Sequence, residues 1–328
     1  MAFRLGIVGL GMAVTPHAKS LLDLKDRVEV AYAFSPSAER RARFASQFKF
    51  NLCEKLETIL ADKSVDAVLV LTPPNTHLEL VERCAAAGKH VLLEKPLEVS
   101  LEKAERLVSV ASKIKLGIVL QHRFRPGAEK LRETLPRLGA LVSASCAIPN
   151  WRPQSYYDQP GRGTRARDGG GVLLTQGIHT LDLLTWLAGE TSEVKSYSTT
   201  TPIHRMETED LACAALRFES GALGVVLATT SAYPGYPERI ELIGTHGTAV
   251  LEGTALRAQF MDGTSVEMKT ESGAGGTGAD PMAFPHDWHR SLLTDFLDAI
   301  EQRREPRSSG RETLKVHRLI ERILRSGG

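Results

Sequence analysis

The sequence predicts an α/β protein with an N-terminal doubly wound parallel sheet and a C-terminal α/β domain whose sheet is largely antiparallel and open. Three observations lead to this prediction. Short apolar runs alternate with amphipathic helical patterns as far as residue 120, whereas later apolar runs follow one another across turns. The chain also has 328 residues, which suits about two domains at roughly 150 residues each.

The predicted strands of the first domain are continuous apolar runs, as expected for strands that are covered on both faces. They span residues 5–8, 28–33, 67–71, 90–93 and 116–120. Helical patterns lie between them over residues 37–47, 75–87 and 100–112, and Gly88 marks the end of the second helix. Because strand and helix alternate, the strands are expected to run parallel.

Turns replace the crossover helices after residue 122, so the boundary between domains 1–122 and 123–328 is placed there. Gly221-Ala222 joins strands over residues 211–218 and 223–230, and a meander follows from Arg239 through Val266. Helices are predicted near residues 171–187, 286–303 and 311–324. The segment Glu271–Asp280 contains four glycines and is predicted to be a mobile loop.

Composition excludes several classes of protein. Forty-one Lys and Arg against thirty-nine Asp and Glu leave a net charge of +2, too little for a broad nucleic-acid or membrane surface. With 42% hydrophobic and 24% charged residues, the chain is not a disordered one. No apolar run approaches the ~18 residues of a membrane helix, and the first strand begins too early for a signal peptide. Four widely spaced cysteines indicate buried thiols in a reducing compartment, so a soluble cytoplasmic protein is expected.

The segment Gly9-Leu10-Gly11-Met12-Ala13-Val14 follows the first strand and opens a helix. In a dinucleotide-binding loop the first glycine permits the tight turn, and the second lets the pyrophosphate approach the backbone at the helix N-terminus. Val14 takes the place of the third glycine, so the motif is incomplete. The strand–helix–strand context favours an NAD(P)-binding Rossmann domain with Gly9, Gly11 and Met12 at the cofactor, and a plain glycine turn is the alternative.

A carboxylate for the adenosine ribose is expected about 20 residues further on, at the end of the second strand. The segment there is Ala33-Phe34-Ser35-Pro36-Ser37, and the first acid is Glu39. Ser35 and Ser37, together with Arg40 and Arg41, suit the 2′-phosphate of NADP, so NADP is favoured over NAD. The alternative is that the two arginines belong to the solvated face of the next helix.

Polar residues follow three further strands at their carboxyl ends, where open α/β sheets bind ligands. We therefore expect cofactor contacts from Thr72, Pro73, Asn75, His77, Glu94, Lys95 and Gln121, and a substrate contact from Arg123. His77 is expected to cap or pack near the cofactor rather than to take part in the chemistry.

Glu94-Lys95-Pro96 together with Gly169-Gly170-Gly171, His179 and Asp182 is a specific combination. With it, the sequence resembles the glucose–fructose oxidoreductase/inositol dehydrogenase (Gfo/Idh/MocA) family nearly from end to end. The resemblance implies a Rossmann domain, a second domain whose open sheet supports homodimers or homotetramers, and NAD(P)-dependent oxidation or reduction of a sugar or polyol carbon. Residues 1–122 then bind NAD(P), and residues 123–328 bind the substrate and partner subunits.

His179 and Lys95 are the candidate catalytic residues. Hydride removal from a carbinol needs a base for the hydroxyl proton, and the near-neutral pKa of histidine suits that role. A lysine beside the nicotinamide can donate to the same oxygen and stabilise its developing negative charge. A structural histidine and a surface lysine are the alternatives. The family often carries an acid four positions before the histidine, where this chain has Thr175, so the trio of Lys, Asp and His is incomplete. Asp182 either orients the imidazole or is solvated.

The segment Trp151–Asp168 is long for a connection without periodicity, which marks it as a candidate functional loop. It holds three aromatic side chains and four arginines against two acids. Aromatic faces stack on sugars, and arginines bind carboxylate or phosphate, so an anionic or nucleotide-linked sugar is expected. The expected substrate contacts are Trp151, Arg152, Tyr156, Arg162, Thr175 and His179. The segment looks like the sugar and nucleotide-sugar dehydrogenase branch of the family, and an interdomain or intersubunit strap is the alternative.

The leading hypothesis is an NAD(P)-dependent oxidoreductase that transfers a hydride between nicotinamide and a sugar or polyol. The alternatives are a cofactor-binding sensor without turnover and a glycosidase that oxidises its substrate transiently. Intact Lys95 and His179 favour chemistry over sensing. No metal site is expected, because His286 and His289 have helical spacing but no third ligand nearby in the sequence.

Overall fold

In a computed structural model that describes residues 2–269 and 285–327, the chain divides into two compact units. The first unit comprises Met1–Gln121 and His286–Leu314, and the second comprises His122–Pro285 and Lys315–Gly328. The predicted glycine-rich loop at residues 271–280 lies outside the described residues. The assignment of cofactor binding to residues 1–122 and of substrate binding to 123–328 stays a prediction.

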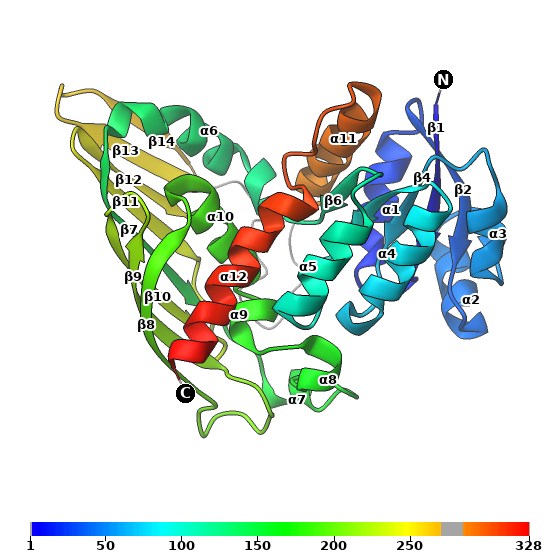
Figure 1. Ribbon diagram of the computed structural model, residues 1–328, viewed down its shortest axis with the longest axis horizontal. Helices are drawn as coiled ribbons and strands as arrows, with labels where there is room; N and C mark the ends of the chain where they lie inside the picture. The colour runs from blue at the N-terminus through cyan, green and yellow to red at the C-terminus, as the bar shows by residue number, and fades with distance from the viewer. Residues whose placement is uncertain (1, 270–284, 328) are drawn as a thin grey trace. The chain divides into compact units, whose positions relative to one another are not determined.

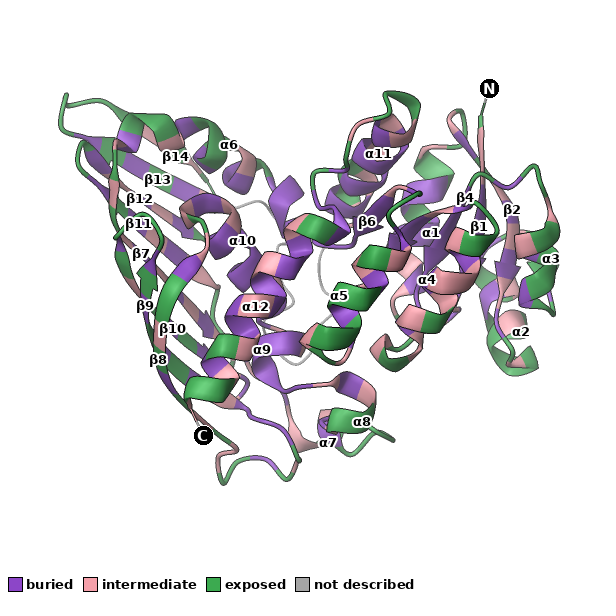
Figure 2. Cartoon of the chain, viewed as in Figure 1, coloured by how far each residue is buried: buried purple, intermediate pink, exposed green. Residues whose placement is uncertain are grey.

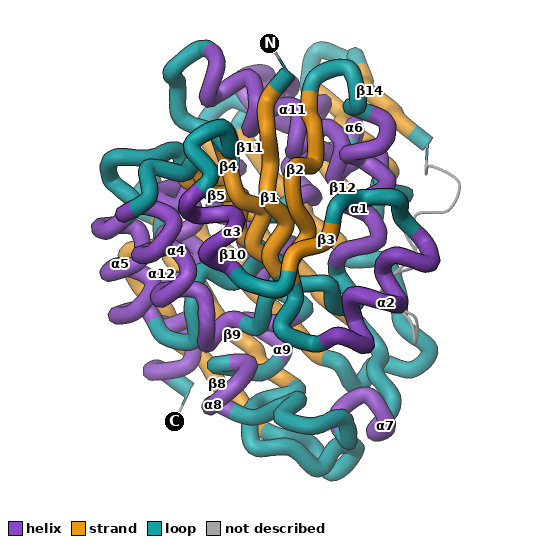
Figure 3. Tube along the Cα trace, turned by 90° about the vertical axis from the view of Figure 1, so that its right-hand side faces the viewer, coloured by secondary structure: helices purple, strands orange, loops and turns teal. Residues whose placement is uncertain are grey.

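The first unit is built on a six-stranded sheet in the order β3-β2-β1-β4-β5-β6, and every neighbouring pair of strands is parallel. This is the order of a doubly wound dinucleotide-binding sheet, so the predicted fold of the first domain is confirmed. Figure 3 shows β2, β1 and β4 side by side. The strands are β1 Phe3–Val8, β2 Val28–Phe34, β3 Leu52–Cys53, β4 Ala67–Val70, β5 His90–Leu93 and β6 Leu116–Ile118.

Helices connect the parallel strands of this sheet, and the central strands are buried. β4 is buried along its whole length, which explains its unbroken apolar sequence. The helices of this unit are α1 Val14–Asp23, α2 Ala38–Gln47, α3 Leu56–Ala61, η1 Pro74–Thr76, α4 His77–Ala86, α5 Leu101–Val110 and α11 Asp287–Glu301. α11 comes from the far end of the chain, and the following Ser308 hydroxyl donates to the Ile118 carbonyl oxygen at 2.7 Å.

The second unit is built on an eight-stranded sheet in the order β14-β13-β12-β11-β7-β10-β9-β8 (Figure 1). Only the β7–β10 pair is parallel, and the other pairs are antiparallel, as predicted. The strands are β7 Leu141–Pro149, β8 Thr191–Thr199, β9 Leu211–Phe218, β10 Leu223–Thr229, β11 Arg239–Gly244, β12 Gly247–Glu252, β13 Ala255–Phe260 and β14 Ser265–Met268.

One face of this sheet is buried and the other is open. Residues of β9 alternate between buried and exposed along the strand, and Figure 2 shows the same alternation in its neighbours. The helices of this unit are α6 Pro126–Thr134, η3 Leu135–Leu138, α7 Gln154–Tyr157, α8 Arg165–Asp168, α9 Val172–Thr175 and α10 Ile178–Ala188. Two elements span the boundary between the units in sequence, η2 Gln121–Phe124 and α12 Gly310–Ser326.

The prediction of one continuous helix over residues 171–187 is wrong, because the structure has two helices there. The segment is divided into α9 and α10, because the Gly177 N–H donates to the Val172 carbonyl oxygen at 2.7 Å and so closes a wider turn. Four cysteines were expected to be buried, but Cys213 is exposed on β9, and no cysteine of the described chain forms a disulfide. No described helix combines the length and apolarity that crossing a membrane would require.

Candidate active site

The glycine turn after β1 has the backbone that a dinucleotide-binding loop needs. Gly9 has a φ of 106°, and a Cβ at this position would lie 2.7 Å from the Leu71 carbonyl oxygen, so only glycine fits. A Cβ at Gly11 would meet nothing within 4 Å, which leaves its backbone open to an approaching group. Met12 is exposed beside it. Together with the N-terminus of α1, this cradle fits the pyrophosphate of NAD(P).

The residues after β2 differ in whether their side chains already have hydrogen-bond partners. Ser35 is buried, and its hydroxyl accepts a 3.3 Å hydrogen bond from the Ser37 N–H. Arg41 donates to the Ser35 carbonyl oxygen at 2.8 Å and to Glu54 at 2.9 Å, so it holds this turn together. Arg40, on the first turn of α2, is exposed, and its guanidinium has no partner among the described residues. Of the residues considered for a 2′-phosphate, Arg40 is therefore the available cation.

The turn after β4 is organised by His77, which is fully buried. Its Nε2 lies 2.9 Å from the Thr72 carbonyl oxygen, and its Nδ1 lies 3.0 Å from that of Pro96. Burial lowers the pKa of His77, so the neutral ring donates from one nitrogen at a time. Pro73 and Asn75 are exposed on the same turn. His77 thus packs between two predicted cofactor-binding turns, and its non-catalytic role stays a prediction.

Glu94 and Lys95 follow β5, and Gln121 follows β6, at the same edge of the sheet as the glycine turn. The Glu94 carboxylate binds the His17 ring and the Lys95 N–H, each at 3.1 Å. Gln121 is buried, and its Oε1 has no partner among the described residues. Parallel pairing therefore brings the predicted cofactor-binding residues of the first unit to one edge.

In the second unit, η2 and α10 are joined by two neighbouring contacts. Arg123 binds both carboxylate oxygens of Asp182, at 2.7 Å and 2.6 Å, and both side chains are buried. The solvated alternative for Asp182 is therefore wrong, and Arg123 has a structural partner that sequence reasoning missed. One residue earlier, the His122 ring stacks on His179, with centroids 4.5 Å apart. A role for Arg123 in substrate binding stays a prediction.

The predicted substrate loop places two guanidinium groups around one aromatic ring. Arg162 donates to the Tyr156 hydroxyl at 2.8 Å, and its guanidinium lies 4.6 Å from the Tyr156 ring centroid. Arg152 lies 5.8 Å from the same centroid, and burial lowers the pKa of its guanidinium. Gln176 donates to the Tyr156 hydroxyl at 3.5 Å and contacts the Thr175 hydroxyl. The structure thus groups Arg152, Tyr156, Arg162 and Thr175, and Trp151 instead packs on Tyr233 with centroids 5.4 Å apart.

Sequence reasoning missed the buried pair His204 and Asp210, which anchors this loop. His204 Nδ1 lies 2.7 Å from the Asp210 carboxylate, and its Nε2 donates to the Arg152 carbonyl oxygen at 2.8 Å. Hydrogen bonding holds the pKa of Asp210 below its ordinary value despite burial. Both residues lie in a segment with no motif, so no sequence signal pointed to them.

The triple glycine is held by a second missed residue, Glu209. Its carboxylate accepts from the Gly171 N–H at 3.0 Å and from the Leu173 N–H at 3.2 Å. A Cβ at Gly171 would lie 1.7 Å from the Glu209 carbonyl oxygen. The glycine is therefore needed for this close approach, which fixes the start of α9.

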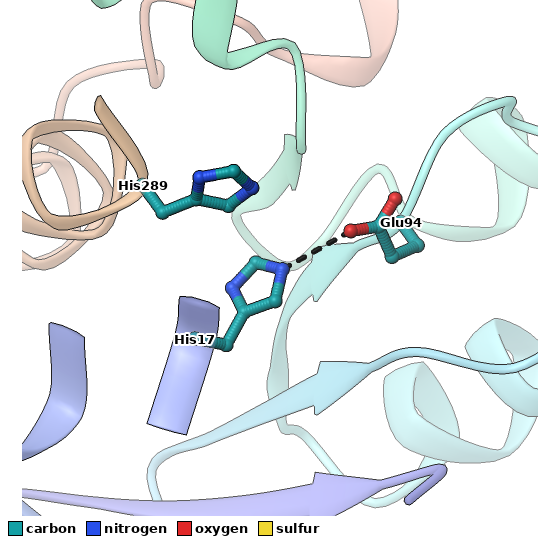
Figure 4. Close-up of side chains that lie close together, drawn as sticks. All are labelled: His17, Glu94 and His289. Atoms are coloured by element: carbon teal, nitrogen blue, oxygen red, sulfur yellow. Dashed lines mark hydrogen bonds and ion pairs between the residues drawn. The ribbon is translucent and has the colours of Figure 1, made fainter. Parts of the chain in front are cut away.

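His289 lies near two potential metal ligands that the sequence did not point to. His17, Glu94 and His289 each place one ligand atom within 4.8 Å of the others (Figure 4). His286 is not among them, because it pairs with Asp23 at 2.9 Å. Sequence reasoning looked for ligands near in the chain, whereas these three come from α1, the β5 turn and α11.

Comparison with known proteins decides the family. One family model, described as an oxidoreductase family with an NAD-binding Rossmann fold, matches residues 3–122, and the GFO/IDH/MocA C-terminal domain matches residues 131–250. The chain belongs to the Gfo/Idh/MocA family. The predicted family, the two-part α/β fold and the enzyme class are thereby confirmed. As a Gfo/Idh/MocA protein, the chain is an oxidoreductase that uses a nicotinamide dinucleotide.

Named relatives within the Gfo/Idh/MocA family act on sugars and polyols. Myo-inositol 2-dehydrogenase of Thermotoga maritima is 34% identical over 262 residues, 74% of this chain and 73% of its own. The 1,5-anhydro-D-fructose reductase of Ensifer adhaerens is 29% identical over 293 residues, 87% of this chain and 84% of its own. The WlbA dehydrogenase of Bordetella pertussis, solved with NADH and UDP-GlcNAcA, is 27% identical with a TM-score of 0.84, covering 100% of this chain and 97% of that one.

Proposed function

We propose that this enzyme transfers a hydride between the nicotinamide and a carbinol carbon of an anionic sugar or sugar derivative, including nucleotide-linked sugars. The observation that carries the anionic class is the pair of guanidinium groups around Tyr156. Arg152 is buried, and this burial lowers the pKa of its guanidinium because it removes the cation from water. A buried cation favours binding of a carboxylate or phosphate. Sugar and polyol relatives, including one solved with a nucleotide sugar acid, support the same class.

The proposed chemistry assigns proton transfer to His179 and charge stabilisation to Lys95. A bound nicotinamide dinucleotide supplies the hydride acceptor. His179 takes the proton of the substrate hydroxyl as the carbon is oxidised, because a neutral imidazole is a base at physiological pH. Lys95 donates a hydrogen bond to the same oxygen and stabilises its negative charge. In the reductive direction His179 returns the proton to the carbonyl oxygen while Lys95 keeps its hydrogen bond to that oxygen.

We further propose that NADP is the preferred dinucleotide. No acid stands at the end of β2, and Arg40 is exposed on the first turn of α2. A guanidinium binds a phosphate dianion with charge-assisted hydrogen bonds that the 2′-hydroxyl of NAD does not offer. Gly9, Gly11 and Met12 would hold the pyrophosphate, and the turns bearing Thr72 and Glu94 would hold the remainder.

The homo-oligomer and the cytoplasmic location predicted from the sequence are also part of this proposal. The open face of the β7–β10 region carries exposed apolar side chains, which favour contact with a second copy. All four cysteines are free thiols, which suits a reducing compartment.

Reduced-nicotinamide absorbance tests the proposed function directly. NAD and NADP are each combined with a neutral polyol, a neutral sugar, a uronate and a nucleotide sugar acid. We expect the dinucleotide to be reduced in the presence of at least one anionic sugar. The kcat/KM should be higher with NADP than with NAD. Turnover restricted to neutral sugars would contradict the anionic class, and dinucleotide binding without turnover of any sugar would favour a sensor. Release of an aglycone without net cofactor change would favour a glycosidase.

A further inference from the structure

The Glu94 carboxylate bridges a side chain and the backbone of Lys95. Its Oε1 lies 3.1 Å from His17 Nε2, and its Oε2 accepts from the Lys95 N–H at 3.1 Å (Figure 4). The carboxylate is mostly buried, so water competes little for either oxygen. The position of the Lys95 backbone is therefore coupled to His17, which lies on a different element, α1.

The position of His17 is fixed by packing between α1 and α11. It is buried within α1, and its ring packs edge-on against His289 of α11, with centroids 4.9 Å apart and an interplanar angle of 88°. α1 and α11 are joined further by Asp23, which pairs with Arg290 at 2.7 Å. Burial holds the pKa of His289 well below its ordinary value, so this ring is neutral and adds no charge beside the hydrogen bond between His17 and Glu94.

A second buried histidine holds the other side of the same turn. His77 Nδ1 lies 3.0 Å from the Pro96 carbonyl oxygen and 3.2 Å from that of Leu97. The residues on either side of Lys95 are thus attached to two different helices, by His17 through Glu94 and by His77 directly. A lysine side chain has four rotatable bonds, so a fixed backbone is what limits the positions its ammonium group can reach.

We propose that His17 is a positioning residue for Lys95 and acts through the Glu94 carboxylate. The inference rests on the proposed function, because that function assigns Lys95 to the substrate oxygen. A displacement of about 1 Å at a catalytic group can cost roughly 10²-fold in rate. Loss of the His17 hydrogen bond frees the Glu94 carboxylate to rotate and releases the Lys95 N–H.

The same three side chains have the composition of a metal site, but the described contacts favour the hydrogen bond. A metal on His17 Nε2 would displace its proton to Nδ1, which is buried and has no partner among the described residues. Metal-binding imidazoles normally donate that second N–H to an acceptor. In the hydrogen-bonded arrangement the proton stays on Nε2 and donates to Glu94, so no N–H of His17 is buried without an acceptor.

Three variants test the proposal. His17→Phe keeps a ring against His289 but removes the donor, whereas His17→Gln keeps a donor near the position of Nε2. His90→Phe is the matched control, since His90 lies at the opposite end of β5 and accepts a 2.9 Å hydrogen bond from the Lys115 N–H. We expect His17→Phe to lower kcat about 10- to 100-fold with little change in sugar KM or dinucleotide affinity. His17→Gln should recover kcat to within a few-fold, and His90→Phe should retain it.

A double variant separates this inference from the proposed function. His17→Phe should lower kcat no further in the Lys95→Ala background, because both changes remove the same contribution. If Lys95→Ala keeps kcat, the proposed function fails. If Lys95→Ala loses kcat and His17→Phe keeps it, only the positioning role fails. A His17→Gln variant no better than His17→Phe overturns it too.

Two further measurements cover misfolding and metal. Glu94→Gln breaks the same bridge from its other end, so it replaces His17→Phe if that variant does not fold, and a kcat equal to wild type would overturn the proposal. Elemental analysis of the purified enzyme should find no stoichiometric transition metal. One zinc or iron per chain that disappears in His17→Phe would make Glu94 a metal ligand and overturn the hydrogen-bonded bridge.

Discussion

At the residue scale, the roles proposed for His179 and Lys95 make the sharpest kinetic prediction. Losing a positioned general base typically costs 10²–10⁴ in rate. We expect His179→Ala and Lys95→Ala each to lower kcat by about that factor while dinucleotide affinity stays within a few-fold, and to combine less than additively. Steady-state kinetics and fluorescence titration measure the two effects. A His179→Ala enzyme that retains more than about a tenth of kcat would refute the assignment.

Arg162 allows a test of the anionic substrate with a control in the same loop. Arg162→Met removes the charge beside Tyr156 but keeps the length of the side chain. The KM of a uronate or nucleotide sugar acid should rise roughly tenfold or more, equivalent to about 1.4 kcal/mol, and the KM of a neutral sugar should not change. Arg165→Met is the control, because Arg165 is exposed and pairs only loosely with Glu207 at 3.8 Å. Equal effects on charged and neutral sugars would rule out charge recognition by Arg162.

Arg40 permits an equally direct test of the preferred dinucleotide. In Arg40→Ala the Kd of NADP should rise about tenfold, the loss of one charge-assisted contact, while that of NAD stays the same. Arg43→Ala is the matched control, since Arg43 is exposed on the same helix. Fluorescence titration measures the Kd of each dinucleotide for wild type and for both variants. If the affinity for NADP is unchanged in Arg40→Ala, Arg40 is a solvated residue of α2 that does not bind the 2′-phosphate.

At the element scale, the start of α9 depends on the contact between Gly171 and Glu209. A methyl group at Gly171 would overlap the Glu209 carbonyl oxygen, so Gly171→Ala should destabilise the fold by about 2 kcal/mol or more. Gly170→Ala is the control, because its Cβ would meet only the Leu174 side chain, at 3.1 Å. Its cost should stay below about 1 kcal/mol. Urea unfolding measures both, and equal stabilities would show that the loop can shift.

Glu209 also predicts a pH dependence whose sign follows from burial. Burial raises its pKa above the ordinary 4.5, so the folded chain keeps the proton over a pH range where the unfolded chain has lost it. The stability that Glu209 contributes therefore falls as the pH rises from 4.5 through the folded-state pKa. We expect the free energy of unfolding of wild type minus that of Glu209→Gln to fall across this range. A difference that rises with pH would contradict the raised pKa.

The elements recovered from the sequence are those with strong patterns. Continuous apolar runs located β1, β2, β4, β5 and β6, because burial on both faces requires apolar residues throughout. β7 and β8 were missed, since the alanines of β7 and the Glu and Lys residues of β8 carry weak strand preference. The division between α9 and α10 was also missed, because it depends on a hydrogen bond at Gly177 rather than on periodicity.

The sequence placed the candidate cofactor-binding residues at strand ends but did not predict their contacts. Parallel pairing put Gly9, Thr72 and Glu94 at one edge, as sequence order alone predicts. The side chains that contact the candidate site residues are distant in the sequence. His289 approaches Glu94 from a helix nearly 200 residues later in the chain, and Arg123 finds Asp182 across η2 and α10. Such pairs follow from tertiary packing and leave no local signal.

At the scale of the whole molecule, an apolar face crosses the middle of the open sheet. Val225 and Leu227 point outward from β10, at 57% and 45% exposure. In register beside Leu227 lie the exposed Cys213 of β9 and, one strand further, the exposed Tyr197 of β8. A contiguous apolar face on a central strand is unusual for a monomer and typical of an interface.

This face predicts a homo-oligomer that a single charge disrupts. Val225→Lys places an ammonium group at the centre of the apolar face, where burial against a second copy would cost several kcal/mol. We expect wild type to elute as a dimer or tetramer by size-exclusion chromatography with light scattering, and Val225→Lys to dissociate towards monomer at micromolar concentration. Met261→Lys is the control, because Met261 is the more exposed residue, at 79%, but lies at the β13–β14 turn, away from this face. If Val225→Lys keeps the mass of wild type, the subunits associate elsewhere, and a monomeric wild type would remove the oligomer from the proposal.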